Sequence, residues 1–168
     1  IETIADNTFL NNAIGIELPF SYFNGTNFVI QRNDFFSTRP LLDPIYNGTW
    51  SIFHIDINRH NSEPLSTSYL GIFSNTFRNT PVNWSNSTVG IRVFSGRSIP
   101  IINNFFEDVD RGIFLLSSGA ANYMEANDFR NCNIGIYNLN NTFNEIVGNT
   151  FDLGIRASNM AILNQTAR

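Results

Sequence analysis

Lysine is absent from this chain of 168 residues, so all ten Lys or Arg residues are arginine. Only 14% of the residues are charged, and with histidine neutral the net charge is −4. A mildly acidic chain of this kind has no basic surface with which to neutralise a phosphate backbone. The composition therefore argues against nucleic acid as a partner.

Cysteine and long apolar runs are also scarce. The single cysteine, Cys132, excludes an internal disulfide and any zinc site built from several cysteines. No apolar run approaches the roughly 20 residues that a membrane helix requires. We therefore expect no membrane span and no internal disulfide.

A short phrase recurs six times along the chain. It consists of an aliphatic residue or Met, two variable positions, and then Asn-x-Phe. The copies are Ile4/Asn7/Phe9, Ile30/Asn33/Phe35, Ile72/Asn75/Phe77, Ile101/Asn104/Phe106, Met124/Asn127/Phe129 and Ile146/Asn149/Phe151. Recurrence at this period indicates a solenoid, in which equivalent residues of successive coils form rows. A weaker seventh copy is expected at Ala161/Asn164/Thr166.

A second phrase, Gly-Ile followed by a variable residue, alternates with the first. It begins at Gly15, Gly90, Gly112, Gly135 and Gly154, and residues 51–57 are the matching segment without glycine. Its apolar residues alternate with a period of two, which predicts a strand with one buried face. No segment shows the 3.6-residue period of an amphipathic helix.

The spacing inside the first phrase predicts a bend. Asn and Phe lie two residues apart and share a face of a straight strand, whereas the aliphatic residue three before Asn has the opposite parity. Both apolar residues can point inward only if the chain turns between them. Because Asn tolerates the left-handed conformation, we expect Asn to make this turn. We also expect all six Asn side chains to form an internal hydrogen-bonded ladder and all six Phe rings to form an internal row.

These rows resemble the right-handed parallel β-helix, in particular the secreted β-helix repeat proteins related to pectate lyases. The predicted fold is all-β, a single-stranded solenoid of about six to seven coils that forms one domain over residues 1–168. A leucine-rich repeat is disfavoured because its Leu-x-x-Leu-x-Leu pattern is missing. Residues 1–6 and 161–168 do not read as polar caps, so we expect a piece of a longer protein.

Three insertions interrupt the regular coils, at residues 36–50, 58–69 and 78–88. In solenoids, insertions map to loops that often form the binding face. Trp50 and Trp84 lie in or at the end of these insertions, together with His60 and four of the six prolines. We expect the two Trp side chains either to stack on sugar rings or to close apolar flaps over the helix edge.

The residues that follow each Gly-Ile should point outward and align along one sheet. They are Glu17, Asp56, Arg92, Phe114, Tyr137 and Arg156. Such a row would suit an acidic or neutral glycan, and the plain alternative is a solvated face of mixed charge. The predicted ligand-binding residues are therefore Glu17, Asp56, Arg92, Tyr137, Arg156, Trp50 and Trp84.

The chemistry known on similar scaffolds finds little support in this chain. The resemblance implies one of two chemistries. A lyase would need Ca²⁺ and a basic residue, for which Arg92, Arg111 or Arg156 would serve. A glycosidase would need two carboxylates, and Glu17 and Asp56 come nearest. The acidic run at residues 107–110 reads as a solvated turn, and Cys132 as a packing residue. His54 and His60 lack a third ligand. We therefore expect no metal and no cofactor, and the catalytic residues stay unassigned.

Two functions of different classes remain. The favoured one is a structural or adhesive module of a secreted or cell-surface protein, a fibre subunit for example, which associates with itself or with neighbouring domains through the solenoid ends. The alternative is a carbohydrate-active enzyme or a glycan-binding domain. Sequons would suit a secreted protein and occur at Asn24, Asn47, Asn83, Asn86, Asn140 and Asn164.

Overall fold

The chain forms 18 strands in a computed structural model that describes residues 2–18, 28–38, 52–58, 70–80, 88–96, 98–116, 122–140, 144–154 and 159–165. These described residues contain no helix. The strands form three parallel sheets of six strands each. In this part of the chain no helix is long and apolar enough to cross a membrane.

The three sheets, called A, B and C here, contain every third strand. Sheet A contains β1 (Glu2–Ala5), β4 (Phe28–Gln31), β7 (Leu70–Phe73), β10 (Pro100–Ile102), β13 (Tyr123–Glu125) and β16 (Glu145–Val147). Sheet B contains β2 (Thr8–Leu10), β5 (Asp34–Ser37), β8 (Thr76–Asn79), β11 (Phe105–Glu107), β14 (Asp128–Arg130) and β17 (Thr150–Asp152). Sheet C contains β3 (Ile14–Leu18), β6 (Ile52–Asn58), β9 (Thr88–Phe94), β12 (Arg111–Leu116), β15 (Ile134–Leu139) and β18 (Met160–Gln165).

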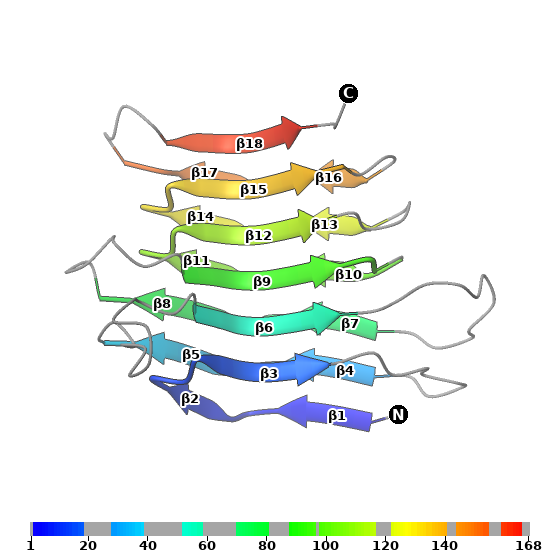
Figure 1. The fold of residues 1–168 in the computed structure, drawn as a ribbon, viewed down its shortest axis with the longest axis vertical. Helices are drawn as coiled ribbons and strands as arrows, with labels where there is room; N and C mark the ends of the chain where they lie inside the picture. The colour runs from blue at the N-terminus through cyan, green and yellow to red at the C-terminus, as the bar shows by residue number, and fades with distance from the viewer. Residues whose placement is uncertain are drawn as a thin grey trace, which may run out of the picture.

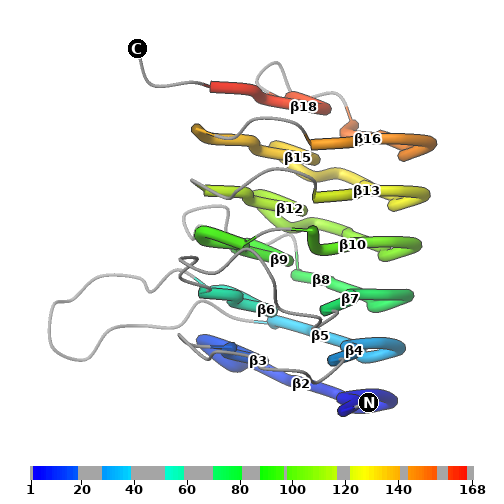
Figure 2. The backbone as a smooth tube through the Cα atoms, turned by 90° about the vertical axis from the view of Figure 1, so that its right-hand side faces the viewer, coloured from blue at the N-terminus to red at the C-terminus, as the bar shows by residue number. Residues whose placement is uncertain are grey.

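The chain therefore winds through sheets A, B and C in turn and completes six coils (Figure 1). Each strand pairs in parallel with its equivalent in the next coil, and the two chain ends lie at opposite ends of the stack (Figure 2). This is the right-handed parallel β-helix that the repeats predict. The expected insertions begin later than the sequence suggested, because Phe36 and Ser37 belong to β5 and Asn79 belongs to β8.

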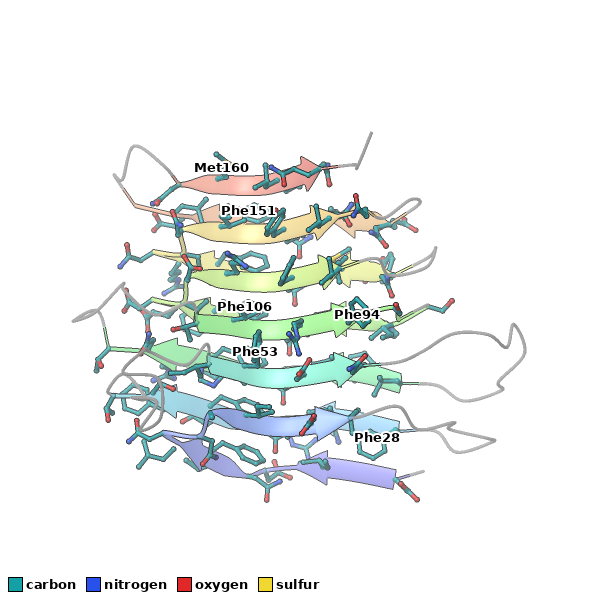
Figure 3. All side chains as sticks on the ribbon, viewed as in Figure 1. Phe28, Phe53, Phe94, Phe106, Phe151 and Met160 are labelled. Carbon is teal, nitrogen blue, oxygen red and sulfur yellow. The ribbon has the colours of Figure 1, made fainter. Side chains whose placement is uncertain are left out.

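The interior is built from rows of identical side chains. In sheet B the six repeat phenylalanines are in register, and their rings stack with centroids 4.6 to 5.0 Å apart. The four central rings, of Phe35, Phe77, Phe106 and Phe129, are fully buried. Isoleucine rows face them from sheets A and C, with Met124 as the single exception among the described partners. Figure 3 shows side chains filling the space between the sheets.

The two end members of the phenylalanine row depart from the expected full burial. Phe9 in the first coil and Phe151 in the last coil are only partly buried. Phe9 stacks on Phe35 with centroids 4.6 Å apart, and Phe151 stacks on Phe129 with centroids 4.9 Å apart. Each end ring therefore has a stacked neighbour on one face only, and its other face is left open. The prediction of six internal rings is correct for the four central coils and wrong for Phe9 and Phe151.

A row of small residues runs along sheet C and makes room for this stack. A Cβ atom on Gly90 would lie 2.6 Å from the ring of Phe106, closer than real Cβ contacts, so a larger residue cannot enter without displacing the ring. Gly15, Gly112 and Gly135 make the same close approach to the Phe ring of the next coil. In the second coil, His54 takes the place of the glycine. The residues on either side of it, Phe53 and Ile55, pair with the residues on either side of Gly15.

Asparagine forms the expected ladder, although it does not make the left-handed turn. The residue before each repeat Asn has the positive φ, which ranges from 52° at Arg32 to 62° at Gly148. The Asn instead bonds to the next coil: the Asn33 backbone N–H and Nδ2 each donate to Asn75 Oδ1 at 3.0 Å. The same pair of bonds joins every successive coil. The side chain thus satisfies the backbone groups that the turn leaves unpaired.

The ladder is internal only in its four central members. Asn33, Asn75, Asn104 and Asn127 are buried, whereas Asn149 in the last coil is partly exposed and Asn7 in the first coil is exposed. Asn149 Oδ1 still accepts from the backbone N–H and Nδ2 of Asn127, each at 2.9 Å, but no further repeat Asn lies beyond it. The expectation of six internal amides is therefore wrong for Asn7 and Asn149, for the same reason as at the end rings.

The last coil also differs from the sequence expectation in its register. Gly154 lies in a turn with φ of 71°. The sixth strand of sheet C is β18, which begins at Met160 and not at the Gly-Ile phrase. Ile162 of β18 pairs with Ile136, so Ala161 and Asn164 belong to the sixth coil and form no seventh copy. The expectation failed because Gly154 lies in a turn, although Gly-Ile at 154–155 matches the repeat phrase.

Candidate functional site

The outer face of sheet C brings most of the predicted binding residues into one row. Register pairs place Glu17, Asp56, Arg92, Phe114, Tyr137 and Leu163 on successive coils. We call this set the outer row of sheet C. The strands that carry it, β3, β6, β9, β12, β15 and β18, lie in front in Figure 1. Leu163 occupies the position that the sequence assigned to Arg156.

An ion pair occupies the centre of the row. The Arg92 guanidinium donates to both carboxylate oxygens of Asp56, with Nε to Oδ1 at 2.8 Å and Nη2 to Oδ2 at 2.5 Å. Arg92 also lies over the ring of Phe53 at 4.0 Å, which adds a cation–π contact. The Asp56 side chain is only 3% exposed. Its carboxylate is therefore fixed and neutralised, in a geometry that is specific for Arg and carboxylate.

An aromatic pair occupies the next two coils of the row. The rings of Phe114 and Tyr137 are stacked with centroids 4.9 Å apart, and both side chains are partly exposed. The Arg111 guanidinium lies 5.2 Å from the Phe114 ring and 5.4 Å from the Tyr137 ring. The Tyr137 hydroxyl and Gln165 Oε1 are 2.7 Å apart, with the hydroxyl donating. Parallel pairing of β9, β12, β15 and β18 fixes the backbone beneath this surface.

Apolar residues extend the aromatic pair along the same face. Phe94, Leu116 and Leu139 are in register two residues beyond Arg92, Phe114 and Tyr137, and all three are partly exposed. The repeat phrases did not mark these three as surface residues. The two successive leucines at 115 and 116 could have predicted an apolar surface residue. Adjacent strand residues point to opposite faces, so one of the two leucines must point outward.

The other residues that the sequence singled out lie outside the described residues or in other parts of the fold. Trp50, Trp84, Arg156 and His60 lie outside the described residues. Cys132 is buried, and its thiol donates to the carbonyl oxygens of Phe106 and Arg130. Burial raises the pKa of this thiol to about 12, so it stays protonated and unreactive at neutral pH.

The acidic run at residues 107–110 is engaged locally. Asp108 accepts a hydrogen bond from Asn131 Nδ2, and Asp110 accepts one from Asn133 Nδ2 at 3.1 Å. Asp110 also lies 3.5 Å from Arg111. Across the described ranges, no group of three or more His, Cys, Asp or Glu side chains could hold a metal ion.

His54 lies in the core rather than at a catalytic site. Its ring is 3% exposed, with its centroid 5.7 Å from that of Phe35 and 6.0 Å from that of Phe77. Nε2 is buried and has no hydrogen-bond partner among the described residues. Desolvation lowers the pKa of this imidazole from 6.5 to about 3, so the ring is neutral in the folded protein.

Acid is therefore expected to destabilise the fold through His54. Below pH 6.5 the imidazole is protonated in the unfolded chain, whereas in the folded chain it is protonated only below about pH 3. The free energy of unfolding therefore falls as the pH falls from 6.5 to about 3. Between pH 7 and pH 5 the expected loss is about 2 kcal/mol. His54→Gly, which copies the row residue of other coils, should remove it. Urea unfolding of both proteins at the two pH values measures the difference, and an equal loss in both would contradict the assignment.

Comparison with known proteins adds no family to this description. No protein-family model, no curated protein and no solved structure matches the chain. The outer row of sheet C is therefore interpreted from its own geometry.

Proposed function

We propose that this chain is a structural and adhesive β-helix module of a secreted or cell-surface protein, and that it binds polysaccharide along the outer row of sheet C. The observation that carries the proposal is the stacked pair Phe114 and Tyr137, which stays partly exposed on a rigid sheet. Aromatic rings with a polar neighbour suit a ligand that is apolar on one side and hydroxylated on the other.

Polar groups flank the rings where sugar hydroxyls would lie. Gln165 and the Tyr137 hydroxyl lie on one side, and the pair of Asp56 and Arg92 begins one coil before Phe114. A polysaccharide chain laid along the stack would meet equivalent positions of successive coils in turn. The binding surface is thus a strip on the solenoid side, in addition to the Trp50 and Trp84 loops of the sequence prediction.

The same row favours binding over turnover. Hydrolysis of a glycosidic bond needs two carboxyl groups about 5 to 9 Å apart, one of which gives or takes a proton. Glu17 forms no ion pair with another described residue, but its neighbour Asp56 is held in two bonds by Arg92. A carboxylate in that state is poorly suited to serve as nucleophile or base.

We further propose a relationship to the secreted β-helix repeat proteins that resemble pectate lyases. The continuous Asn ladder and the phenylalanine stack support it. Secretion also agrees with the position of two sequons, since Asn140 and Asn164 are exposed at the surface.

The ends of the solenoid are proposed as the sites of association with further copies or domains. The strongly exposed large hydrophobic side chains of the described residues all lie in the first and last coils. They are Leu10 at 55%, Ile14 at 38%, Val147 at 42%, Met160 at 45% and Ile162 at 41%. Unpaired strand edges beside such side chains can accept another strand.

Loss of the two outer rings should weaken polysaccharide binding. In affinity electrophoresis through gels that contain neutral or acidic polysaccharides, we expect wild-type protein to be retarded by at least one of them. The double variant Phe114→Ala/Tyr137→Ala should bind at least about tenfold more weakly, as expected for central aromatic contacts.

Phe105→Ala is the matched control. Phe105 is also a partly exposed ring beside an arginine, with Arg130 at 5.0 Å, but it lies on sheet B. Equal retardation of the double variant and the control, or no retardation of wild-type protein by any polysaccharide, would refute the proposal.

A further inference from the structure

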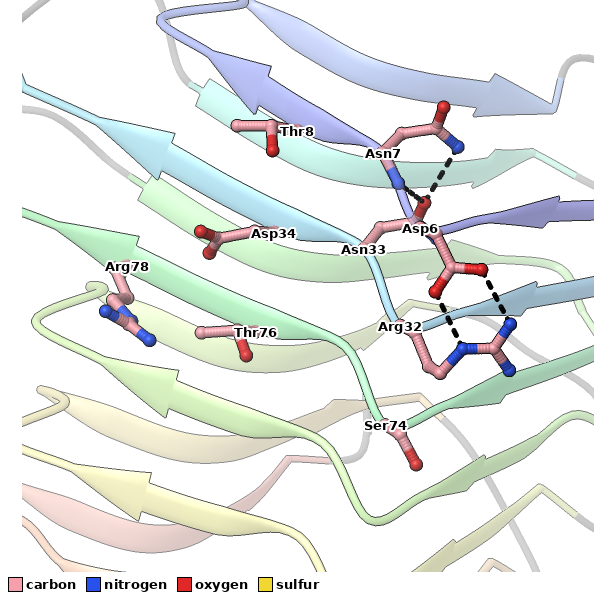
Figure 4. A pocket seen from close by; sticks show the side chains of 9 residues that line it. All are labelled: Asp6, Asn7, Thr8, Arg32, Asn33, Asp34, Ser74, Thr76 and Arg78. Carbon is pink, nitrogen blue, oxygen red and sulfur yellow. Dashed lines mark hydrogen bonds and ion pairs between the residues drawn. The ribbon is translucent and has the colours of Figure 1, made fainter.

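A polar hollow of about 380 Å³ opens at the bend between sheets A and B, in the first three coils. Its lining comes from β2, β5, β8 and the bends before them, as Figure 4 shows. None of its residues belongs to the outer row of sheet C. The hollow is open to solvent, so a ligand would lie on its surface rather than be enclosed.

An ion pair fixes one side of the hollow. Arg32 donates to Asp6 through Nε to Oδ1 and through Nη2 to Oδ2, each at 2.7 Å. These two residues have the left-handed backbone conformation at consecutive bends. The pair therefore bridges the two bends at the exposed rim of the hollow.

A carboxylate lies at the centre of the hollow between two hydroxyl groups. Asp34 pairs in register with Thr8 on one side and Thr76 on the other, so the three side chains form one outward row (Figure 4). Asp34 Oδ1 is buried and has no hydrogen-bond partner among the described residues. The Asp34 side chain as a whole is partly exposed, so its carboxylate can still accept a hydrogen bond from a ligand hydroxyl at the surface of the hollow.

The same row contains a useful comparison. Asp128 occupies the equivalent position on β14, where Arg130 Nη2 donates to its Oδ2 at 2.9 Å. Asp34 has no such cation, although Arg78 lies in the lining and forms no ion pair with another described residue. The hollow thus keeps one acceptor and one guanidinium available for a ligand.

The charge and polarity of the lining select the ligand class. Two carboxylates, of Asp6 and Asp34, balance two guanidinium groups, of Arg32 and Arg78, and the remaining lining residues are Asn, Thr and Ser. The described lining includes no aromatic or aliphatic residue. A charged ligand would add an uncompensated charge, and an apolar ligand would find no surface to cover. A small neutral molecule rich in hydroxyl groups fits both conditions.

We propose that this hollow is a second binding site, which takes one neutral hexose unit. Asp34 accepts a hydrogen bond from a sugar hydroxyl, Arg78 donates to a sugar oxygen, and Thr8 and Thr76 do either. The site is independent of the outer row of sheet C, so it can be present or absent whether or not that row binds polysaccharide. A ligand this small implies a dissociation constant in the millimolar range.

Titration of ¹⁵N-labelled protein with glucose, galactose and mannose, followed by amide chemical shifts, tests the site. We expect saturable shifts at Thr8, Asp34 and Thr76 with at least one of these hexoses. Galacturonate and glucosamine, which carry a charge, should bind more weakly than that hexose. Shifts confined to Phe114 and Tyr137, or no saturable shift with any of the three hexoses, would overturn the proposal.

Asp34→Asn should weaken hexose binding at least about tenfold, because it removes the charged acceptor. The variant should fold, since Asp34 is partly exposed and forms no ion pair with another described residue. Asp128→Asn is the matched control and should leave the affinity unchanged. Thr76→Val removes a hydroxyl from the same row and should weaken hexose binding several-fold. This variant tests the proposal if Asp34→Asn does not fold. Wild-type affinity in either folded hollow variant would overturn the proposal.

Discussion

Replacement of Phe106 by alanine is expected to lower the free energy of unfolding by about 3 to 5 kcal/mol. The side chain is fully buried, and its ring stacks on those of Phe77 and Phe129 with centroids 4.8 Å away on both sides. Gly90 packs against the same ring and has no side chain that could move into the space, so the substitution leaves a cavity beside it. The loss therefore combines the removed apolar surface with the cavity.

Urea unfolding measures this loss as a lower midpoint with an unchanged slope. Phe105→Ala is the control, because Phe105 precedes Phe106 on β11 and is partly exposed on the outer face. It should cost far less. Equal losses in the two variants, or a loss below about 1 kcal/mol for Phe106→Ala, would contradict a buried phenylalanine stack.

Replacement of Asn104 by leucine should cost at least about 3 kcal/mol, since a buried polar group that loses its partner costs about 1 to 3 kcal/mol. Asn104 Nδ2 donates to Ile72 O at 3.0 Å, Ile102 O at 3.1 Å and Asn127 Oδ1 at 3.1 Å. Its Oδ1 accepts from the backbone N–H and Nδ2 of Asn75, at 2.9 and 3.1 Å. Leucine has a similar size, so the loss reports the hydrogen bonds more than the packing.

The same change at Asn7 is the control for the ladder. Asn7 is exposed in the first coil, and its side chain donates to Ala5 O and Asn33 Oδ1 without an accepting role in the described ladder. Asn7→Leu should cost less than half as much in the same urea measurement. If the two variants lose equal stability, the internal ladder does not hold the coils together.

The recurring phrases allowed the fold to be predicted because a solenoid repeats its sequence wherever it repeats its geometry. Ile72, Asn75 and Phe77 reappear at each coil, so spacing alone gave the rows and the register of three sheets. The turn was assigned to the wrong residue for a physical reason. Asn is the common left-handed residue, but here its side chain is needed for the ladder, and the residue before it takes the positive φ.

Burial along the rows could not be read from the phrases, because the end copies have the same residues as the central ones. Phe9 and Phe151 match Phe106 in sequence, yet they are only partly buried. Asn149 likewise matches Asn104 and is partly exposed. The difference comes from the number of neighbouring coils, which is two in the middle of the stack and one at each end.

The site could be predicted less well, because pairings between coils depend on side-chain geometry. The outer row placed Asp56 beside Arg92, and the sequence did not reveal that Arg92 occupies both oxygens of the carboxylate. The sequence also gave no sign that His54 is buried, since nothing local marks an inward residue where other coils have glycine. The hollow around Asp34 joins residues of three coils, and no motif within one coil indicates it.

Amide hydrogen exchange at the repeat asparagines tests the stacked rows most directly. Each of these residues follows a turn, where an amide N–H is ordinarily exposed to solvent and exchanges quickly. In the ladder, the N–H groups of Asn33, Asn75 and Asn104 donate to the next Asn Oδ1 at 3.0, 2.9 and 3.0 Å. They should therefore exchange as slowly as the amides of the central strands. Exchange at the rate of an unprotected turn would contradict the ladder and the parallel β-helix built on it.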